Sequence, residues 1–146
     1  MAYGRKGLWV ELPDDAPVTV IEPEFIPGLP NERKALAAAL TSPIASPPLR
    51  DLVNPSDSVS VGFSDLTRPM PSDRVLPVLL EELARAGVPD GHIVLINALG
   101  THRPQTEAEL KAMLGDELVN RYRIVQHNAW DESNLVGEKW KKCAWI

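Results

Sequence analysis

The amino-acid sequence predicts an α/β domain built on a mainly parallel β-sheet. Short apolar runs typical of strands occur at residues 57–63, 92–98 and 123–126. Segments with the apolar spacing of amphipathic helices lie between these runs, and short connections between such elements favour right-handed crossovers. The second run is almost entirely apolar, as expected for a strand that is covered on both faces. We therefore expect a three-layer, Rossmann-like arrangement.

The first 56 residues are predicted to form a β-hairpin and two helices. Alternating apolar residues at 8–12 and 18–21, separated by a turn with two prolines, predict an amino-terminal β-hairpin. Asn31 is a suitable N-cap for a helix over residues 32–40. The proline pair within residues 46–52 suits the first turn of a second, short helix.

The central helices have clear start and stop signals. Apolar residues at helical spacing predict a helix over residues 72–85, which Gly87 would end. Thr106 and Glu109 match a capping box at the start of the next helix. Gly115 would end that helix and separate it from one or two further turns.

Composition and charge restrict the class of protein. The chain has 146 residues, 44% hydrophobic and 24% charged, which is typical of one globular domain with its own core. A net charge of −5 without a long basic run argues against binding along a nucleic-acid backbone. The sequence shows neither a membrane-length apolar stretch nor a signal-peptide core, and Cys143 is its single cysteine. We expect a cytoplasmic protein that binds neither nucleic acid nor membranes.

Polar loops follow the first two predicted strands. In open parallel sheets, ligands bind beyond the carboxyl ends of the strands, where both loops would lie. Prolines restrict the backbone of each loop, so we expect the two loops to hold their side chains in one shared site. The first loop contributes Asp65, Thr67, Arg68 and Ser72, and the second contributes Thr101, His102 and Arg103.

The charged residues of these loops each allow more than one interpretation. His102 could act as a general acid or base near neutral pH, or could hydrogen-bond to the backbone. Arg68 could bind a carboxylate or phosphate, or could form a surface salt bridge with Asp65 or Asp73. Asp65 could orient Arg68, bind a ribose hydroxyl, or form an Asx-turn.

The remaining polar candidates are weaker. Thr67, Ser72 and Thr101 could donate hydrogen bonds to an anion, although Ser72 could equally cap the following helix. His127 follows the third strand, where local hydrogen bonding is favoured over function, and His92 lies at the opposite end of its strand. No zinc motif, dinucleotide fingerprint or phosphate-binding glycine loop occurs, so we assign no metal ligand.

Taken together, the two loops also resemble a known family. SDLTRPMPS at residues 64–72 and ALGTHR at residues 98–103 are similar to the SD-x-TRP-x-PS and A-x-G-x-HR segments of the nickel-dependent lactate racemases. The similarity continues through residues 104–114 and 125–128, and it extends over about residues 8–136. Either loop alone would be suggestive, and both in this order and spacing are specific.

The resemblance implies an amino-terminal domain, residues 1–136, of a 2-hydroxyacid racemase or epimerase. Such enzymes use a nickel-pincer nucleotide, which takes a hydride from the substrate carbon while a histidine takes the hydroxyl proton. His102 matches one of the two acid/base histidines. Arg68 matches the arginine that holds substrate or cofactor anions, and Asp65 with Thr67 matches the lining of that pocket.

The resemblance ends in a divergent tail at residues 137–146. The family's second domain, absent here, supplies the cofactor-binding lysine, the nickel-binding histidine and the second acid/base histidine. We therefore expect this chain to be inactive alone, whether it is truncated, frameshifted or naturally short. Two alternatives stay open: a non-catalytic module that binds a nucleotide or hydroxyacid, and a structural fragment that self-associates through an exposed apolar face.

Overall fold

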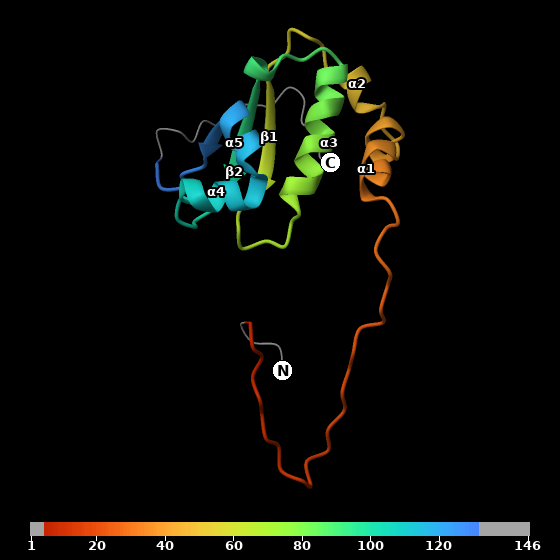
Figure 1. Ribbon diagram of the computed structural model, residues 1–146, viewed down its shortest axis with the longest axis vertical. Helices are drawn as coiled ribbons and strands as arrows, with labels where there is room; N and C mark the ends of the chain where they lie inside the picture. The colour runs from red at the N-terminus through yellow and green to blue at the C-terminus, as the bar shows by residue number, and fades with distance from the viewer. Residues whose placement is uncertain (1–4, 132–146) are drawn as a thin grey trace.

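The computed structural model of the chain describes residues 5–131, so the predicted tail at residues 137–146 lies outside the described part. The centre of the fold is a three-stranded parallel sheet in the order β1-β2-β3 (Figure 1). These strands, β1 (Val59–Ser64), β2 (Ile93–Ala98) and β3 (Arg123–Gln126), confirm the predicted parallel α/β class.

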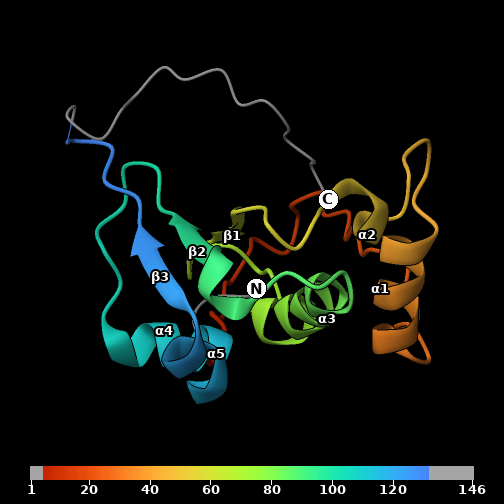
Figure 2. The same ribbon diagram turned by 90° about the horizontal axis from the view of Figure 1, so that it is seen from above.

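Three helices connect the strands. α3 (Ser72–Arg85) joins β1 to β2, and α4 (Glu107–Leu114) with α5 (Asp116–Arg121) joins β2 to β3. Figure 2 shows all three helices on one face of the sheet, as expected when sequential neighbouring strands are joined by crossovers of one hand. The described residues therefore form two of the three layers that the sequence predicted.

The two faces of the sheet differ in burial because only one carries helices. Leu95, at the centre of β2, is 0% exposed and pairs in register with Val61 of β1 and Ile124 of β3. The neighbouring row of Gly62, Ile96 and Val125 lies on the other face and is partly or fully exposed. The sequence predicted that both faces of β2 are covered. Among the described residues, helices cover only one of them.

The helix boundaries follow the signals in the sequence. α3 ends where Gly87 adopts φ 88°, and the amide of Val88 donates to the carbonyl of Leu83 at 3.1 Å, which is the hydrogen bond of a Schellman motif. Thr106 and Glu109 form the predicted capping box of α4. A short 3₁₀ helix, η1 (Asp90–His92), precedes β2 and takes His92 out of the predicted strand.

Two helices precede the sheet, and the second of these packs Leu49 against the core. α1 (Glu32–Thr41) is capped by Asn31, whose side chain accepts a hydrogen bond from the amide of Lys34 at 2.9 Å. α2 (Leu49–Leu52) follows after a short loop. Leu40 is the one buried residue of α1.

The predicted amino-terminal hairpin is not formed. Residues 8–12 and 18–21 contain no strand, and Figure 1 shows this part of the chain extending away from the domain. Trp9 is 99% exposed and Ile21 is 90% exposed. A two-stranded hairpin is marginal unless it packs its apolar face on something else, and residues 8–12 and 18–21 are exposed throughout. Within the same range, no helix is long and apolar enough to cross a bilayer.

Candidate active site

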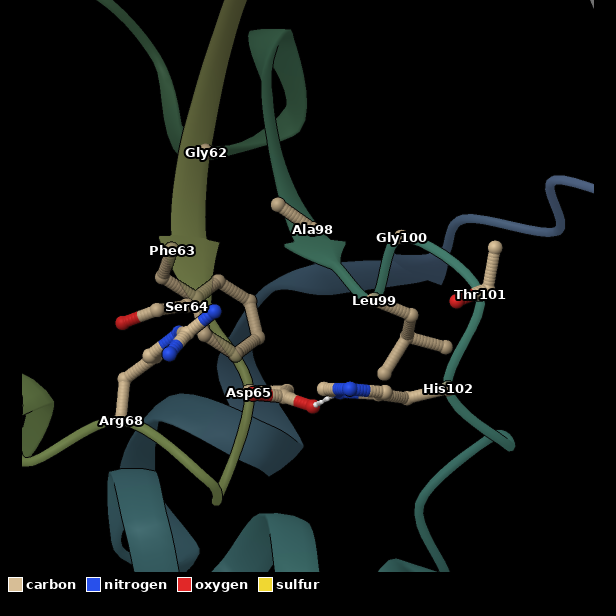
Figure 3. A pocket seen from close by; sticks show the side chains of 10 residues that line it. All are labelled: Gly62, Phe63, Ser64, Asp65, Arg68, Ala98, Leu99, Gly100, Thr101 and His102. Carbon is tan, nitrogen blue, oxygen red and sulfur yellow. Dashed lines mark hydrogen bonds and ion pairs between the residues drawn. The ribbon is translucent and has the colours of Figure 1, made fainter.

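An open pocket of about 490 Å³ lies at the carboxyl ends of β1 and β2. Both polar loops contribute to it, because parallel neighbouring strands deliver their following loops to the same edge of the sheet. Figure 3 shows this pocket from close by. Its lining residues are Gly62, Phe63, Ser64, Asp65, Arg68, Ala98, Leu99, Gly100, Thr101 and His102.

Asp65 organises the first loop. Its Oδ1 accepts hydrogen bonds from the hydroxyl of Thr67 at 2.6 Å and from the amide of Thr67 at 3.2 Å, which makes the Asx-turn considered from the sequence. The amide of Arg68 closes the turn by donating to the carbonyl of Asp65 at 3.1 Å. The carboxylate is 4% exposed, and its second oxygen is left for a different partner.

That partner is His102, from the other loop. Oδ2 of Asp65 and Nδ1 of His102 are hydrogen-bonded to each other (Figure 3). The hydrogen bonds from the Thr67 hydroxyl and from the His102 ring lower the pKa of Asp65 below its usual value, so this group is a carboxylate at neutral pH. A carboxylate can only accept a hydrogen bond, so Nδ1 must donate it. In a neutral His102 ring the proton is therefore on Nδ1, and Nε2 keeps its lone pair. The ring is 48% exposed.

Arg68 provides a positive charge on the same pocket. Figure 3 shows Arg68 and His102 on opposite sides of Asp65. The salt bridge to Asp65 or Asp73 that the sequence allowed is not made, and residues 5–131 contain no ion-pair partner for this guanidinium. A guanidinium without a carboxylate partner is suited to bind a carboxylate or phosphate through two parallel hydrogen bonds.

Of the three predicted hydroxyl side chains, only one lines the pocket. Thr101 lines the pocket, whereas Thr67 reaches it only through its hydrogen bonds to Asp65. Ser72 is 2% exposed and is not part of the lining, and its hydroxyl also fails to cap α3, whose N-cap is Pro71.

Arg103 does not line the pocket. Its guanidinium pairs with Glu109 of α4, with nitrogen–oxygen distances of 2.7 and 2.9 Å. This pairing raises the pKa of Arg103 and, with the capping interaction of Thr106, lowers the pKa of Glu109 to about 2. Arg103 therefore fastens the second loop to the start of α4.

Sequence reasoning missed three amide side chains next to the pocket, the buried Asn97 and Gln105 and the partly buried Gln126. The signal that could have found them is Asn97, a polar residue near the end of an otherwise apolar strand. His127 does not line the pocket, and its amide donates to the carbonyl of Asn97 at 3.0 Å. Within residues 5–131, no group of His, Cys, Asp and Glu side chains could hold a metal ion.

This arrangement is that of an α/β protein with a polar pocket at the carboxyl ends of two neighbouring parallel strands. The family model described as lactate racemase N-terminal domain matches residues 3–139. The chain therefore belongs to the lactate racemase N-terminal domain family.

Individual relatives agree with this membership. The chain is 37% identical over 106 residues to a lactate racemase of Lactiplantibacillus plantarum, covering 73% of this chain and 25% of the relative. It is 30% identical over 135 residues to a lactate racemase of Thermoanaerobacterium thermosaccharolyticum, covering 91% of this chain and 32% of the relative. The solved lactate racemase apoprotein from the latter organism superimposes with a TM-score of 0.64 at 32% identity, covering 70% of this chain and 24% of that one. The chain thus spans about a quarter to a third of the length of these relatives.

Proposed function

We propose that this chain supplies the amino-terminal part of the active site of a nickel-dependent, lactate-type 2-hydroxyacid racemase or epimerase. The observation that carries the proposal is the Asp65–His102 pair beside Arg68 in one pocket. Membership of the lactate racemase N-terminal domain family supports it. A cytoplasmic location remains a prediction from the sequence.

In the proposed mechanism, His102 moves the hydroxyl proton of the substrate. Asp65 keeps Nδ1 protonated, so Nε2 is free to accept the proton from the hydroxyl group on the carbon that inverts. The imidazolium that results is stabilised by the adjacent carboxylate. In the reverse direction the same nitrogen would give the proton back to the carbonyl oxygen, and the opposite enantiomer would use the second acid/base histidine.

Arg68 would orient the substrate. A 2-hydroxyacid carries its carboxylate one carbon away from the reacting hydroxyl, so a guanidinium on the carboxylate fixes the hydroxyl relative to His102. Thr101 adds a hydroxyl on the second loop that could donate to the same anion. Arg68 and His102 come from different loops, and the short strands that carry these loops are paired directly.

The residues present fit the anionic groups of the family's nickel-pincer nucleotide, since Arg68 is available for a phosphate or carboxylate. When bound, that cofactor supplies the centre that accepts the hydride. The described residues contain no cluster suited to nickel, so the nickel ligand, the tethering lysine and a second acid/base histidine would come from a carboxy-terminal domain. We accordingly propose that the chain is inactive alone.

A chimera tests this function. The part of the Thermoanaerobacterium thermosaccharolyticum lactate racemase that aligns with this chain would be replaced by it, and the folded, cofactor-loaded protein would be assayed for interconversion of D- and L-lactate by chiral chromatography. We expect racemisation by the chimera, none by the chain alone, and at least a ~100-fold loss in the chimera with His102→Ala. Near-normal turnover by that variant would refute the role of His102.

A non-catalytic binding module is the second candidate. It would need only the anion-binding groups that this chain itself places on the pocket, Arg68 and Thr101. Calorimetry of the chain with D-lactate, L-lactate and nicotinic acid mononucleotide distinguishes the two functions. Binding together with a folded, loaded chimera that fails to racemise would favour the module over the racemase.

A further inference from the structure

The side chain of Gln126, the last residue of β3, pairs with the backbone of Gln105. Its Oε1 accepts a hydrogen bond from the amide of Gln105 at 2.7 Å, and its Nε2 donates to the carbonyl of Gln105 at 2.8 Å. One side-chain amide thus satisfies both backbone groups of Gln105, as a neighbouring strand would. This fixes the point at which the loop carrying His102 ends.

Asn97 fixes the point at which the same loop begins. It is 0% exposed, and its Nδ2 donates to Oε1 of Gln105 at 2.8 Å and to Oε1 of Gln126 at 3.5 Å. Its carbonyl accepts the amide of Leu99 at 3.0 Å. The three amides, which we call the amide clamp, therefore join both ends of the loop to the end of β3.

His102 lies inside this closed loop. Its amide donates to the carbonyl of Leu99 at 3.0 Å, and Leu99 is 2% exposed. Only two residues separate His102 from Gln105, so a shift of Gln105 changes where the imidazole lies. Asp65, by contrast, belongs to the other loop. It can form its hydrogen bond to the ring only when the second loop places Nδ1 within reach.

Not every polar atom of the amide clamp has a hydrogen-bond partner. Oδ1 of Asn97 and Nε2 of Gln105 are buried and have no hydrogen-bond partner among the described residues. Buried polar groups without partners destabilise a fold, and apolar residues of similar size would remove that cost. A costly polar cluster under a site loop is more readily explained by the position it imposes.

We propose that Asn97, Gln105 and Gln126 are positioning residues for His102. The amide clamp holds the second loop so that Nδ1 of His102 meets Asp65 and Nε2 faces the pocket. Its consequence for catalysis rests on the proposed racemase function, but its geometric consequence does not require turnover.

Nuclear magnetic resonance of the full chain tests the geometry. The ring ¹⁵N shifts of His102 report its tautomer, and the side-chain carboxyl shift of Asp65 reports its titration. In the parent chain we expect the Nδ1-protonated tautomer. In Gln126→Ala we expect a mixture of tautomers and a pKa of Asp65 closer to its usual value, because the hydrogen bond from His102 helps to lower it.

Two further variants separate positioning from stability. Gln126→Glu keeps the size and one acceptor but loses the donor to the Gln105 carbonyl, so it should shift the tautomer even if Gln126→Ala does not fold. Val125→Ala lies on the same strand but on the other face of the sheet, and it should leave both signals unchanged. A clamp that is merely structural would lower the urea midpoint of the Gln126 variants without moving either signal, and that result would overturn the proposal.

The racemase chimera gives the functional measurement. Gln126→Glu should lower kcat by about tenfold to a hundredfold, as small displacements and lost positioning contacts do, with little change in KM because Arg68 lies on the other loop. An inactive parent chimera counts against the proposed function and leaves the magnetic resonance test intact. A parent-like kcat for Gln126→Glu in an active chimera refutes the amide clamp alone.

Discussion

Asp65→Asn is the sharpest test of the proposed proton transfer. The amide oxygen of the new side chain can still accept from Thr67, so the turn should persist. Its nitrogen would then face Nδ1 of His102 and donate to it. That reverses the tautomer, puts the proton on Nε2 and removes the lone pair that takes the substrate proton.

The expected loss of kcat depends on how strongly Asp65 determines the tautomer of His102. In the catalytic triad of serine proteases, the same substitution costs about 10⁴-fold through the wrong tautomer. Here the His102 ring is 48% exposed, and water can compete for Nδ1. We therefore expect a loss of kcat between about 10²-fold, the value of a lost general base, and about 10⁴-fold.

The assay is lactate racemisation by the chimera, measured from both enantiomers across pH. Asp73→Asn is the matched control, because Asp73 is an exposed acid in the first turn of α3, shortly after the loop of Asp65, and does not line the pocket. The reasoning is refuted if Asp65→Asn keeps parent-like kcat while its ring ¹⁵N shifts show the reversed tautomer. It is equally refuted if the tautomer does not respond to the substitution at all.

Three further predictions concern the anion site, acid stability and the core. Arg68→Ala should weaken binding of D- or L-lactate by about tenfold to a hundredfold in calorimetry, whereas the ion-paired Arg74, remote from the pocket, should tolerate alanine. Because Arg103 lowers the pKa of Glu109 from 4.5 to about 2, this carboxylate contributes stability that is complete above about pH 4.5 and is lost as pH falls towards 2. Urea unfolding of Glu109→Gln should show a flatter acid dependence, and an unchanged slope would contradict the pairing. Leu95→Ala should cost about 2–5 kcal/mol of unfolding free energy, clearly more than Ile96→Ala on the uncovered face, and equal losses would contradict the assigned faces.

Local signals predicted most of the fold. The signals that begin and end helices act within a few residues, so they can be recognised in a single sequence. Examples are Asn31, the capping box of Thr106 with Glu109, and Gly87. The parallel orientation of the strands followed from the alternation of strands and helices with short connections. The amino-terminal hairpin was wrong because alternation specifies a face that must be covered, and the covering surface is not a local property.

The sequence predicted where the site lies but not which of its residues contact one another. Parallel strands bring their following loops together whatever their sequence, so Asp65, Arg68 and His102 were expected in one region. Their pairing was not, because Asp65 has Arg68 close by in sequence and yet pairs with His102, 37 residues away. Arg103 likewise belongs to the matched motif and is used by Glu109 instead. Such choices depend on the angles at which loops leave the sheet.

α1 is fastened to the rest of the domain mainly by charge. Arg33 pairs with Glu81 and Glu32 pairs with Arg74, both across exposed surface, while Leu40 alone is buried on this helix. Exposed ion pairs are weak and weaken further as ionic strength rises. We therefore expect local opening of α1 to require less free energy than opening of the sheet. The amide protons of α1 would exchange with solvent sooner than those of α3, and salt would widen that difference.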